Sequence, residues 1–301
     1  MVVPEAEDLL AFTERVAPIV FGGFSQGDDT NGSVITRGGG SGVFVAPCYA
    51  ITARHVVRDS FNTNPARADD LRRRESGYTY FPFWSHLFQP SDIRDSKADA
   101  IIWGVTRTWD PMLTDICLLE VAPDGELAKQ RMNAMRSFPD WSLLPPPVGA
   151  LVEMVGFPSS DVELNDGSFR GSFKLTVQRA WVREIFEVRR DRGMYSFPCF
   201  SVDQSTDHGF SGGPVFHEGR LCGLVSGGSV TNETYVASLW PLCLMEIEYP
   251  NLGLLNRKER LADWFESRRL PSIDWQLVRN RAGVARDDQD RPYAFLRPPL
   301  T

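Results

Sequence analysis

The sequence predicts an all-β fold, because many short strand-like runs alternate with turn residues and few segments have helical periodicity. The runs combine β-branched and aromatic residues; they are residues 42–47, 50–52, 115–121, 151–158, 173–182, 199–203, 214–216 and 221–225. Many short strands with turn signals between them are typical of a β-sandwich or a β-barrel. Residues 214–225 predict one hairpin, whose turn consists of His217-Glu218-Gly219-Arg220.

Two short helices are expected outside the β-rich region. Residues 4–17 begin with acidic side chains, which favour a helix N-terminus, and place apolar side chains on one face. Near the other end, Asn256 can cap a second helix, Glu259 follows three residues later, and Pro271 ends the helix. The apolar face of this second helix consists of Leu261, Trp264 and Phe265.

The chain is expected to have four parts. They are an N-terminal helix at 1–18, a first β unit at 19–142 with an insertion at 58–110, a second β unit at 143–250, and a C-terminal helix and tail at 251–301. A proline-rich stretch, residues 143–149, is predicted to be a stiff connector between the two β units.

The composition is that of an ordinary soluble globular protein, with 42% hydrophobic and 24% charged residues. Its net charge of −7 disfavours nucleic acid as a partner, since nonspecific binding to nucleic acid needs a basic surface. The short arginine runs at 72–74 and 189–192 are therefore expected on the solvated surface.

The ends and the cysteines indicate a cytoplasmic protein that needs no cofactor. The first charges of the chain are acidic and no long apolar run follows, which predicts neither a signal peptide nor a membrane partner. Five scattered cysteines without a CxxC pair predict buried free thiols in a reducing compartment and no metal site.

The stretch "DHGFSGGPVF" (207–216) surrounds Ser211 with glycines, which suggests that the backbone presents this hydroxyl. "GFSGG" also satisfies the G-x-S-x-G pattern of an α/β-hydrolase. In that fold the acid and the histidine follow the serine, whereas here only His217 follows, in a predicted turn. The α/β-hydrolase interpretation is therefore disfavoured.

The opposite chain order, histidine, aspartate, serine, is present. His55 ends one strand-like run, Asp115 begins another, and Ser211 follows. A serine hydroxyl becomes a good nucleophile only beside a base, and the base needs an acceptor that holds its tautomer. His55 taken alone could be a packed strand-end histidine, Asp115 could cap a turn, and Asp99 is the rival candidate for the acid.

The motifs "GSGVFVAPCYAITARHVV", "TDICLLEV", "VGFP" and "GFSGGPVF" together resemble the trypsin-like peptidase superfamily, and are closest in style to bacterial HtrA-type protease domains. The resemblance covers roughly residues 20–245. It implies two antiparallel six-stranded β-barrels with the active site in the cleft between them. In that family His55 would be the general base, Asp115 would orient it and Ser211 would attack.

The resemblance also implies binding roles for backbone groups. The N–H groups of Gly209 and Ser211 would form the oxyanion hole, and the residues at 40–42 would match a glycine turn of the first barrel. An extended substrate would pair with the strand edge formed by Ser226, Gly227 and Gly228.

The sequence departs from the family in three places. Phe210 stands where secreted trypsins have the aspartate that binds a new N-terminus, so activation by cleavage is not expected. The cysteines do not match the disulfide framework of trypsins. The fifty or so residues after the barrels are too few for a PDZ domain such as HtrA proteases carry.

Substrate preference has only indirect signals. In the family that the sequence resembles, the base of the pocket for the P1 side chain lies six residues before the nucleophile, which is Ser205 here. A small neutral residue there favours an apolar or small P1 side chain. Asp203 and Asp207 are close in sequence and could instead attract a basic one. His208 and His86 are expected at the surface or at the rim of the pocket. The aromatic segment 77–88 predicts packing or a contact with substrate or partner, and the glycines at 38–40 predict a turn rather than a phosphate-binding loop.

The predicted function is a serine endopeptidase that cleaves protein or peptide substrates through an acyl-enzyme, without metal or organic cofactor. The alternative is a trypsin-like fold that serves as a binding module or a latent subunit. A cytoplasmic protease needs restraint, so we expect residues 58–110 or residues 251–301 to control it. Such a segment would either block the cleft or dock a regulatory protein partner that assembles the oxyanion hole around Gly209.

Overall fold

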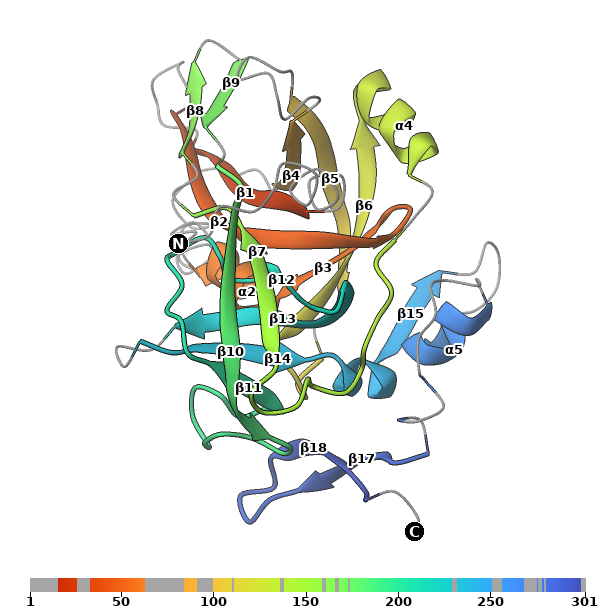
Figure 1. Ribbon diagram of the computed structural model, residues 1–301. Coiled ribbons are helices and arrows are strands. Elements are labelled where there is room, and N and C mark those ends of the chain that lie inside the picture. Colours follow the sequence, from red (N-terminus) through yellow and green to blue (C-terminus); the bar gives the residue numbers. More distant parts are fainter. Residues whose placement is uncertain are drawn as a thin grey trace.

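Two closed antiparallel barrels of six strands each form the body of the protein in this computed structural model (Figure 1). The structure describes residues 16–25, 33–62, 84–90, 100–109, 111–135, 138–158, 161–165, 168–172, 174–228, 232–250, 256–267, 275, 278 and 280–298. The double-barrel all-β fold that the sequence predicts is confirmed.

The first barrel has the strand order β1-β2-β3-β6-β5-β4. Its strands are β1 (Val16–Ser25), β2 (Ser33–Ala46), β3 (Tyr49–Ala53), β4 (Trp84–Pro90), β5 (Ala100–Trp109) and β6 (Ile116–Asp124). The rings of Phe44 and Trp103 meet at a centroid distance of 5.0 Å inside it. Two helices flank the barrel, α2 (Arg54–Asn62) after β3 and α4 (Gly125–Ala134) after β6.

The second barrel has the strand order β10-β11-β14-β13-β12-β7. Its strands are β7 (Leu151–Gly156), β10 (Thr176–Phe186), β11 (Cys199–Val202), β12 (Pro214–His217), β13 (Arg220–Gly228) and β14 (Thr234–Ser238). A separate hairpin, β8 (Asp161–Asn165) with β9 (Ser168–Ser172), lies between β7 and β10 in sequence. The predicted turn between β12 and β13 has positive φ at Glu218 and Gly219, as a type I′ turn requires.

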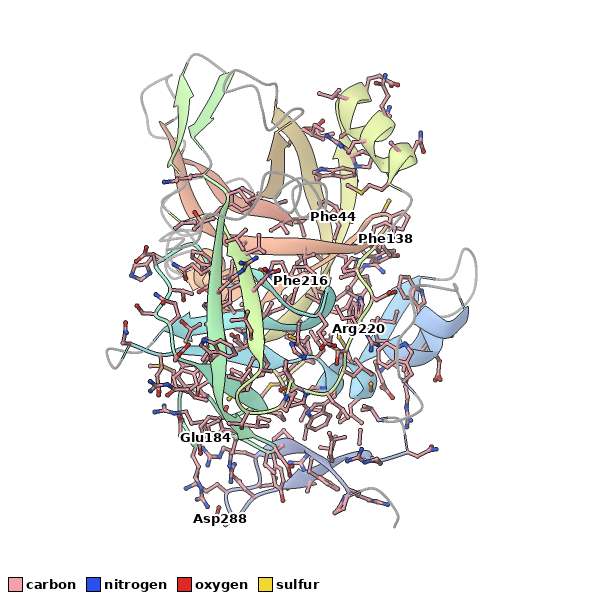
Figure 2. All side chains as sticks on the ribbon, in the orientation of Figure 1. Phe44, Phe138, Glu184, Phe216, Arg220 and Asp288 are labelled. Carbon is pink, nitrogen blue, oxygen red and sulfur yellow. The ribbon has the colours of Figure 1, made fainter. Side chains whose placement is uncertain are left out.

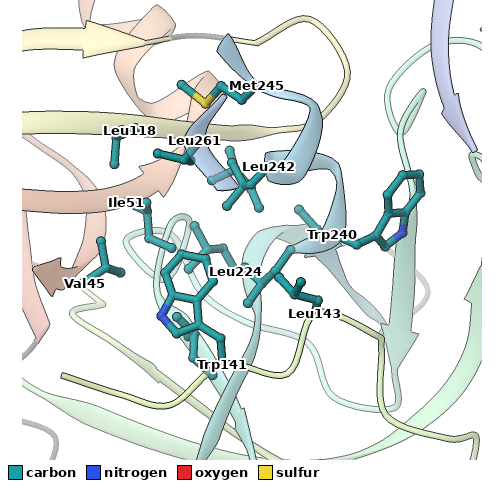
Figure 3. Close-up of a cluster of buried hydrophobic side chains, with 14 of the residues drawn as sticks. Val45, Ile51, Leu118, Trp141, Leu143, Leu224, Trp240, Leu242, Met245 and Leu261 are labelled. Carbon is teal, nitrogen blue, oxygen red and sulfur yellow. The ribbon is translucent and has the colours of Figure 1, made fainter. Parts of the chain in front are cut away.

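Each barrel has its own apolar interior, and a third apolar cluster lies between the two barrels and joins them (Figure 3). On β6, Ile116 and Leu118 belong to this cluster, whereas Cys117 and Leu119 belong to the interior of the first barrel. A strand with two buried faces needs apolar residues in succession, which explains the unbroken run in its sequence. Phe216 of the second barrel belongs to this cluster, whereas Phe44 belongs to the interior of the first barrel (Figure 2).

The segment just before the predicted connector, together with the connector's first residue Leu143, is part of this cluster. Trp141 and Leu143 are buried in it, and the backbone on both sides of Trp141 pairs with Leu221: Leu221 N–H donates to Asp140 O at 2.7 Å, and Ser142 N–H donates to Leu221 O at 2.8 Å. Residues 140–143 therefore fix the barrels to each other, because moving one barrel would expose these side chains.

Residues 58–110 are not an insertion, as the sequence led us to expect. They contain β4 and β5, which close the first barrel: β4 pairs with β1, and β5 pairs with β6. Without them β1 and β6 would be open edges of a four-stranded sheet. His86 lies on β4, and the aromatic segment 77–88 includes the start of that strand; residues 63–83 and 91–99 lie outside the described residues.

The start of the first barrel also differs from the prediction. β1 begins at Val16, so the last residues of the predicted helix 4–17 belong to a strand, and Val16 and Ala17 are buried in barrel packing. The boundary expected between residues 18 and 19 therefore falls inside β1. Residues 1–15 of the predicted helix lie outside the described residues.

After β14 and the short helix η1 (Trp240–Leu244), the chain adds small elements to the outside of the second barrel. β15 (Glu246–Pro250) pairs with β16 (Asn256–Arg260), and α5 (Leu261–Ser267) follows. Asn256 is thus in a strand and caps no helix, a correction to the prediction. The helix starts at Leu261, whose N–H donates to Met245 O at 2.8 Å.

The predicted tail contains a hairpin, β17 (Ala282–Arg286) with β18 (Pro292–Leu296). It lies beyond the second barrel, at the end of the molecule opposite the first barrel (Figure 1). The five cysteines are free thiols, and all except Cys48 are buried. Burial raises the pKa of Cys199 to about 12. Within the described ranges, no helix combines the length and apolar character needed to cross a bilayer.

Replacing Trp103 tests whether β5 is an integral barrel strand. Trp103→Ala removes a fully buried ring and should lower the free energy of unfolding by about 3–5 kcal/mol, as large aromatic-to-alanine changes in cores do. Met112→Ala, at a side chain in the next loop that is 67% exposed, should change it by less than about 0.5 kcal/mol. Urea unfolding measures both; equal effects would contradict the placement of β5.

Candidate active site

The loop that carries Ser211 is anchored in the second barrel. Phe210 is fully buried in that barrel's core and packs so closely on Gly156 that a Cβ on the glycine would lie 2.7 Å from the ring. Gly212 N–H donates to Val225 O at 2.7 Å, and Val225 N–H donates to Gly213 O at 2.9 Å. An apolar side chain thus holds this loop where trypsins use an aspartate.

The same loop reaches the first barrel. Ser41 N–H donates to Ser211 O at 2.8 Å. A Cβ on Gly40 would lie 2.5 Å from Ser211 O and 2.8 Å from a methyl group of Val56, the neighbour of His55. Ser211 O and the segment that carries His55 therefore lie so close to Gly40 that a side chain at position 40 would not fit. The residues at 40–42 lie within β2, not in the turn that the family resemblance implied.

Ser41 and Gly209 fix the turn that precedes the serine. Gly209 has a φ of +97°, and Phe210 N–H donates to Asp207 O, as in a type II turn. The buried hydroxyl of Ser41 donates to Gly209 O at 2.7 Å and accepts the N–H of Phe157 at 3.0 Å. A Cβ at position 209 would clash with the carbonyl oxygen of Phe157, so only glycine fits.

His55 and Asp115 meet at one edge of the first barrel because β3 and β6 pair side by side, with Ala53 opposite Ile116. His55 Nδ1 lies 2.8 Å from Asp115 Oδ2, and the backbone N–H of His55 donates to Asp115 Oδ1 at 3.0 Å. The carboxylate therefore holds both the ring and the backbone of the histidine. Asp99, the rival acid, lies outside the described residues.

Ser226, which the sequence pointed to only as part of a substrate-binding edge, has a second contact. Its hydroxyl donates to Asp115 Oδ2 at 2.6 Å and so reaches from the second barrel to the acid of the first. Asp115 is 8% exposed, and its carboxylate receives donors from both barrels. Sequence pattern alone contains no signal for this contact between β13 and the residue that precedes β6.

The edge of β13 at residues 226–228 extends past its neighbour. β12 pairs with β13 only as far as Leu224, whereas β14 continues along the other side to Gly228. Within the described strands, one side of this edge is therefore left without a strand partner. Thr206 lies beside it: a Cβ on Gly228 would lie 3.3 Å from Thr206 O. Ser205, which precedes Thr206 in sequence, is half-buried.

Two further residues that the sequence singled out are His208 and Asp203. His208 is exposed at the turn before Gly209. Asp203 is used elsewhere, since its Oδ1 accepts the N–H of Trp181 at 2.7 Å. Tyr195, which the sequence analysis missed, places its hydroxyl 3.2 Å from where a Cβ on Gly227 would be. Tyr195 lies in an irregular loop without periodicity, so no sequence signal identifies it.

Electrostatics connect Tyr195 to the same site. Burial raises the pKa of its hydroxyl, the nearby Arg190 charge opposes that rise, and the Asp115 carboxylate is near enough to add to it. No group of three or more His, Cys, Asp or Glu side chains is placed to hold a metal ion within the part of the chain that the structure describes.

The chain matches the family model of the trypsin-like peptidase domain over residues 40–224. No protein with a curated description matches it significantly. Its fold is similar to the active form of Rv3671c protease from M. tuberculosis, with 17% identity and a TM-score of 0.44, over 79% of this chain and 83% of that chain. The inactive form of Rv3671c protease gives 18% identity and a TM-score of 0.42, over 79% and 92%. Likenesses this distant say nothing about activity.

The family match is the stronger finding, because it spans more than half of the 301 residues. The matched region includes His55, Asp115 and Ser211 in the order that the family uses, and the double barrel is the architecture that the resemblance implied. The chain therefore belongs to the trypsin-like peptidase domain family and is a serine endopeptidase.

Proposed function

We propose that the protein hydrolyses peptide bonds in protein substrates by means of a His55–Asp115–Ser211 triad and an acyl-enzyme intermediate. The observation that carries the proposal is the double contact of Asp115 with His55, at 2.8 Å to Nδ1 and 3.0 Å to the backbone N–H. The Ser211 loop contacts the same barrel through the hydrogen bond from Ser41 N–H to Ser211 O.

In this mechanism Ser211 Oγ attacks the carbonyl carbon of the scissile bond while His55 Nε2 accepts the hydroxyl proton. The tetrahedral intermediate collapses when His55 gives that proton to the leaving amine. Water, deprotonated by the same nitrogen, then attacks the acyl ester. The bond to Ser211 Oγ breaks as His55 returns the proton to that oxygen, and the second product leaves with a carboxylate. Asp115 keeps the proton on Nδ1 and stabilises the imidazolium that forms in each half-reaction.

The oxyanion would be bound by the N–H groups of Gly209 and Ser211. The positive φ of Gly209 supports this assignment, since in a type II turn the peptide before that residue is turned over relative to a type I turn. The hydrogen bond from Ser41 to Gly209 O fixes the following peptide. Donors that are positioned before the reaction cost no reorganisation when the negative charge develops.

An extended substrate would bind as an additional strand along Ser226, Gly227 and Gly228. The unpaired side of this edge supports that role. The small side chain of Ser205 favours a small or apolar residue at P1. The engagement of Asp203 with Trp181 N–H supports this preference, because it occupies one of the two carboxylates that could otherwise attract a basic P1 side chain.

Restraint of this activity is also part of the proposal. The turn at Gly209 already has the positive φ that the oxyanion hole needs, so restraint would act on substrate access rather than on this turn. A partner or a segment of the chain would supply it. A cytoplasmic location without nucleic-acid or membrane partners, and the alternative role as a binding module, stay predictions.

Removing the nucleophile or the base tests the triad. Ser211→Ala and His55→Ala should each abolish peptide hydrolysis and leave the urea midpoint unchanged within error, and the double variant should be scarcely worse than either single variant. Labelling with a fluorophosphonate should require both side chains. Losses that add up in the double variant would contradict the triad, and an unlabelled native protein would favour the binding module.

Changing the acid tests which carboxylate orients the histidine. Asp115→Asn keeps the shape of the side chain but holds His55 in the wrong tautomer, so kcat should fall by about four orders of magnitude. Ser226→Ala removes one hydrogen bond to the carboxylate and should lower kcat by roughly 10- to 100-fold. Asp99→Asn is the control, measured on the same peptide; a larger loss from Asp99→Asn would show that Asp115 is not the acid.

Restraint can be measured on the isolated chain. The purified protein should cleave casein slowly despite complete labelling of Ser211 by a fluorophosphonate, because access of large substrates is limited. Short peptides should be cleaved faster than casein per active site. Turnover of casein at ordinary enzyme rates, roughly 1 per second or above, would show that no restraint is present.

A further inference from the structure

The loop that contains Tyr195, residues 187–197, connects β10 to β11 and is tightly folded on itself. Asp191 Oδ1 accepts the N–H of Gly193 at 2.7 Å and that of Tyr195 at 3.3 Å. The N–H of Arg190 donates back to Tyr195 O at 3.1 Å. The backbone position of Tyr195 therefore follows that of residues 190 and 191.

Within this loop, Tyr195 lies next to the substrate-binding edge at residues 226–228. Its ring packs on Tyr235 at a centroid distance of 4.2 Å, and the guanidinium of Arg190 lies 4.5 Å from the Tyr235 ring. Its hydroxyl occupies the space beside Gly227 where a side chain would otherwise be. A peptide paired with this edge would therefore lie next to the phenol.

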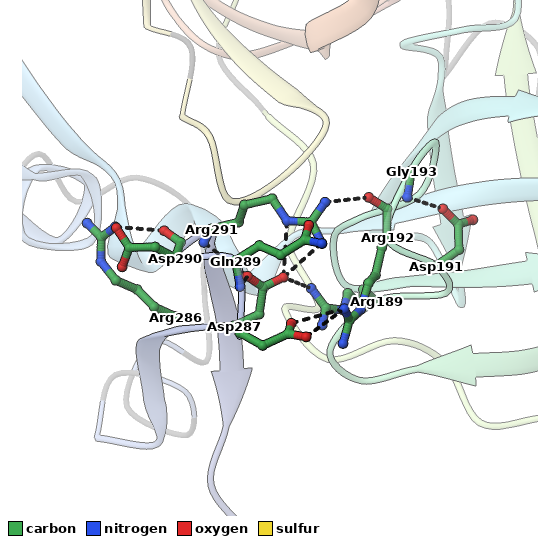
Figure 4. Close-up of polar contacts among 10 residues, drawn as sticks. Arg189, Asp191, Arg192, Gly193, Arg286, Asp287, Gln289, Asp290 and Arg291 are labelled. Carbon is green, nitrogen blue, oxygen red and sulfur yellow. Dashed lines mark hydrogen bonds and ion pairs between the residues drawn. The ribbon is translucent and has the colours of Figure 1, made fainter.

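The C-terminal hairpin holds the outer side of the loop through Asp287 (Figure 4). Asp287 Oδ2 lies 3.0 Å from Nη1 of Arg189, and it also accepts Nε and Nη2 of Arg291 at 3.1 and 3.0 Å. Arg291 in turn donates to Arg192 O at 3.2 Å. The guanidinium of Arg189 also lies over the ring of Tyr293, 5.4 Å from its centroid.

Asp287 is the strongest of these links. Its carboxylate is 4% exposed, whereas the Arg192–Asp288 pair is exposed on both sides, and exposed pairs contribute little to stability. Burial alone would raise the pKa of Asp287. Hydrogen bonds from the N–H groups of Arg291 and Gln289 and from the guanidinium groups outweigh it and hold the pKa well below the usual range, so the carboxylate stays charged at neutral pH.

We infer that the C-terminal hairpin sets the affinity for extended peptides: Asp287 is a positioning residue that holds the 187–197 loop, and Tyr195 contacts the bound peptide. The inference rests on the proposed function, since it assumes that peptides bind along β13. It assigns the hairpin to substrate recognition and leaves the chemical step to the triad.

The test compares Asp287→Asn with Asp290→Asn in the full-length protein. Asp290 is a matched control because it belongs to the same hairpin, its side chain is 82% exposed, and it pairs with Arg286 of the hairpin itself. With a hexapeptide substrate, Asp287→Asn should raise KM by about tenfold and keep kcat within twofold, because a charge-assisted hydrogen bond to the loop is lost. Asp290→Asn should behave as the native protein.

A single-residue ester separates recognition from chemistry. It does not reach Gly227, so its hydrolysis should be the same in both variants. Tyr195→Phe should raise KM for the hexapeptide and not for the ester. An unchanged KM for the hexapeptide in Asp287→Asn, or an equal loss on the ester, would overturn the inference.

Hydrogen exchange tests the link without relying on activity. The amides of Gly193 and Tyr195 should exchange at least tenfold faster in Asp287→Asn than in Asp290→Asn. If Asp287→Asn does not fold, Arg189→Gln removes the same contact from the loop side. Equal exchange rates in the two variants would overturn the link between Asp287 and the loop, whether or not the native protein has peptidase activity. A native protein without peptidase activity would instead refute the proposed function.

Discussion

The site depends on one buried carboxylate, Asp115, which is shared by the two barrels. In the first barrel it contacts Nδ1 of His55 and accepts a hydrogen bond from the backbone N–H of the same residue. From the second barrel it accepts a hydrogen bond from the hydroxyl of Ser226. A charge that is 8% exposed is stable only when such donors surround it. The two barrels must therefore keep a fixed relation, and the apolar cluster between them provides it. Asp115 immediately precedes β6, and the same strand contributes Leu118 to that cluster.

Close backbone packing places the nucleophile loop in the same junction. Gly212 has no room for a side chain, because a Cβ would clash with Ser41 O and with the hydroxyl of Thr52. The hydroxyl of Thr52 donates to Ser41 O at 2.7 Å and so links β3 to β2. The loop packs against the surface that these two strands form. On the other side Phe210 is buried in the second barrel. The loop is thus held by packing and backbone hydrogen bonds, with no ion pair at the position where trypsins need one.

The C-terminal elements extend the second barrel in two directions. α5 and η1 add Leu261, Trp264 and Leu242 to the cluster between the barrels. The hairpin β17–β18 adds Ala294 to the same cluster and is also attached to the 187–197 loop by charge. The first attachment is apolar and strengthens the junction that carries Asp115. The second reaches the loop that ends beside Gly227, so the two attachments concern different parts of the site.

The sequence by itself determined the fold class and the order His55, Asp115, Ser211, because these depend on local patterns: strand-like runs, a glycine-rich turn and residues that end or begin a strand. It also identified the β12–β13 hairpin, whose register is set by a two-residue turn. The sequence pattern predicts an insertion where β4 and β5 lie, since their runs are short and flanked by long irregular segments. Asn256 looked like a helix cap, yet pairing with β15 places it in a strand.

Only the tertiary structure decided the contacts between segments far apart in the chain. Ser226 and Asp115 are 111 residues apart, and Arg189 and Asp287 are 98 apart. Serine, arginine and aspartate at such positions have the same local pattern whether they are solvated or paired, because hydrogen bonds and charges leave no periodicity in sequence. Apolar periodicity records which face is buried, but the choice of partner for each polar group is made only when the barrels close and pack against each other.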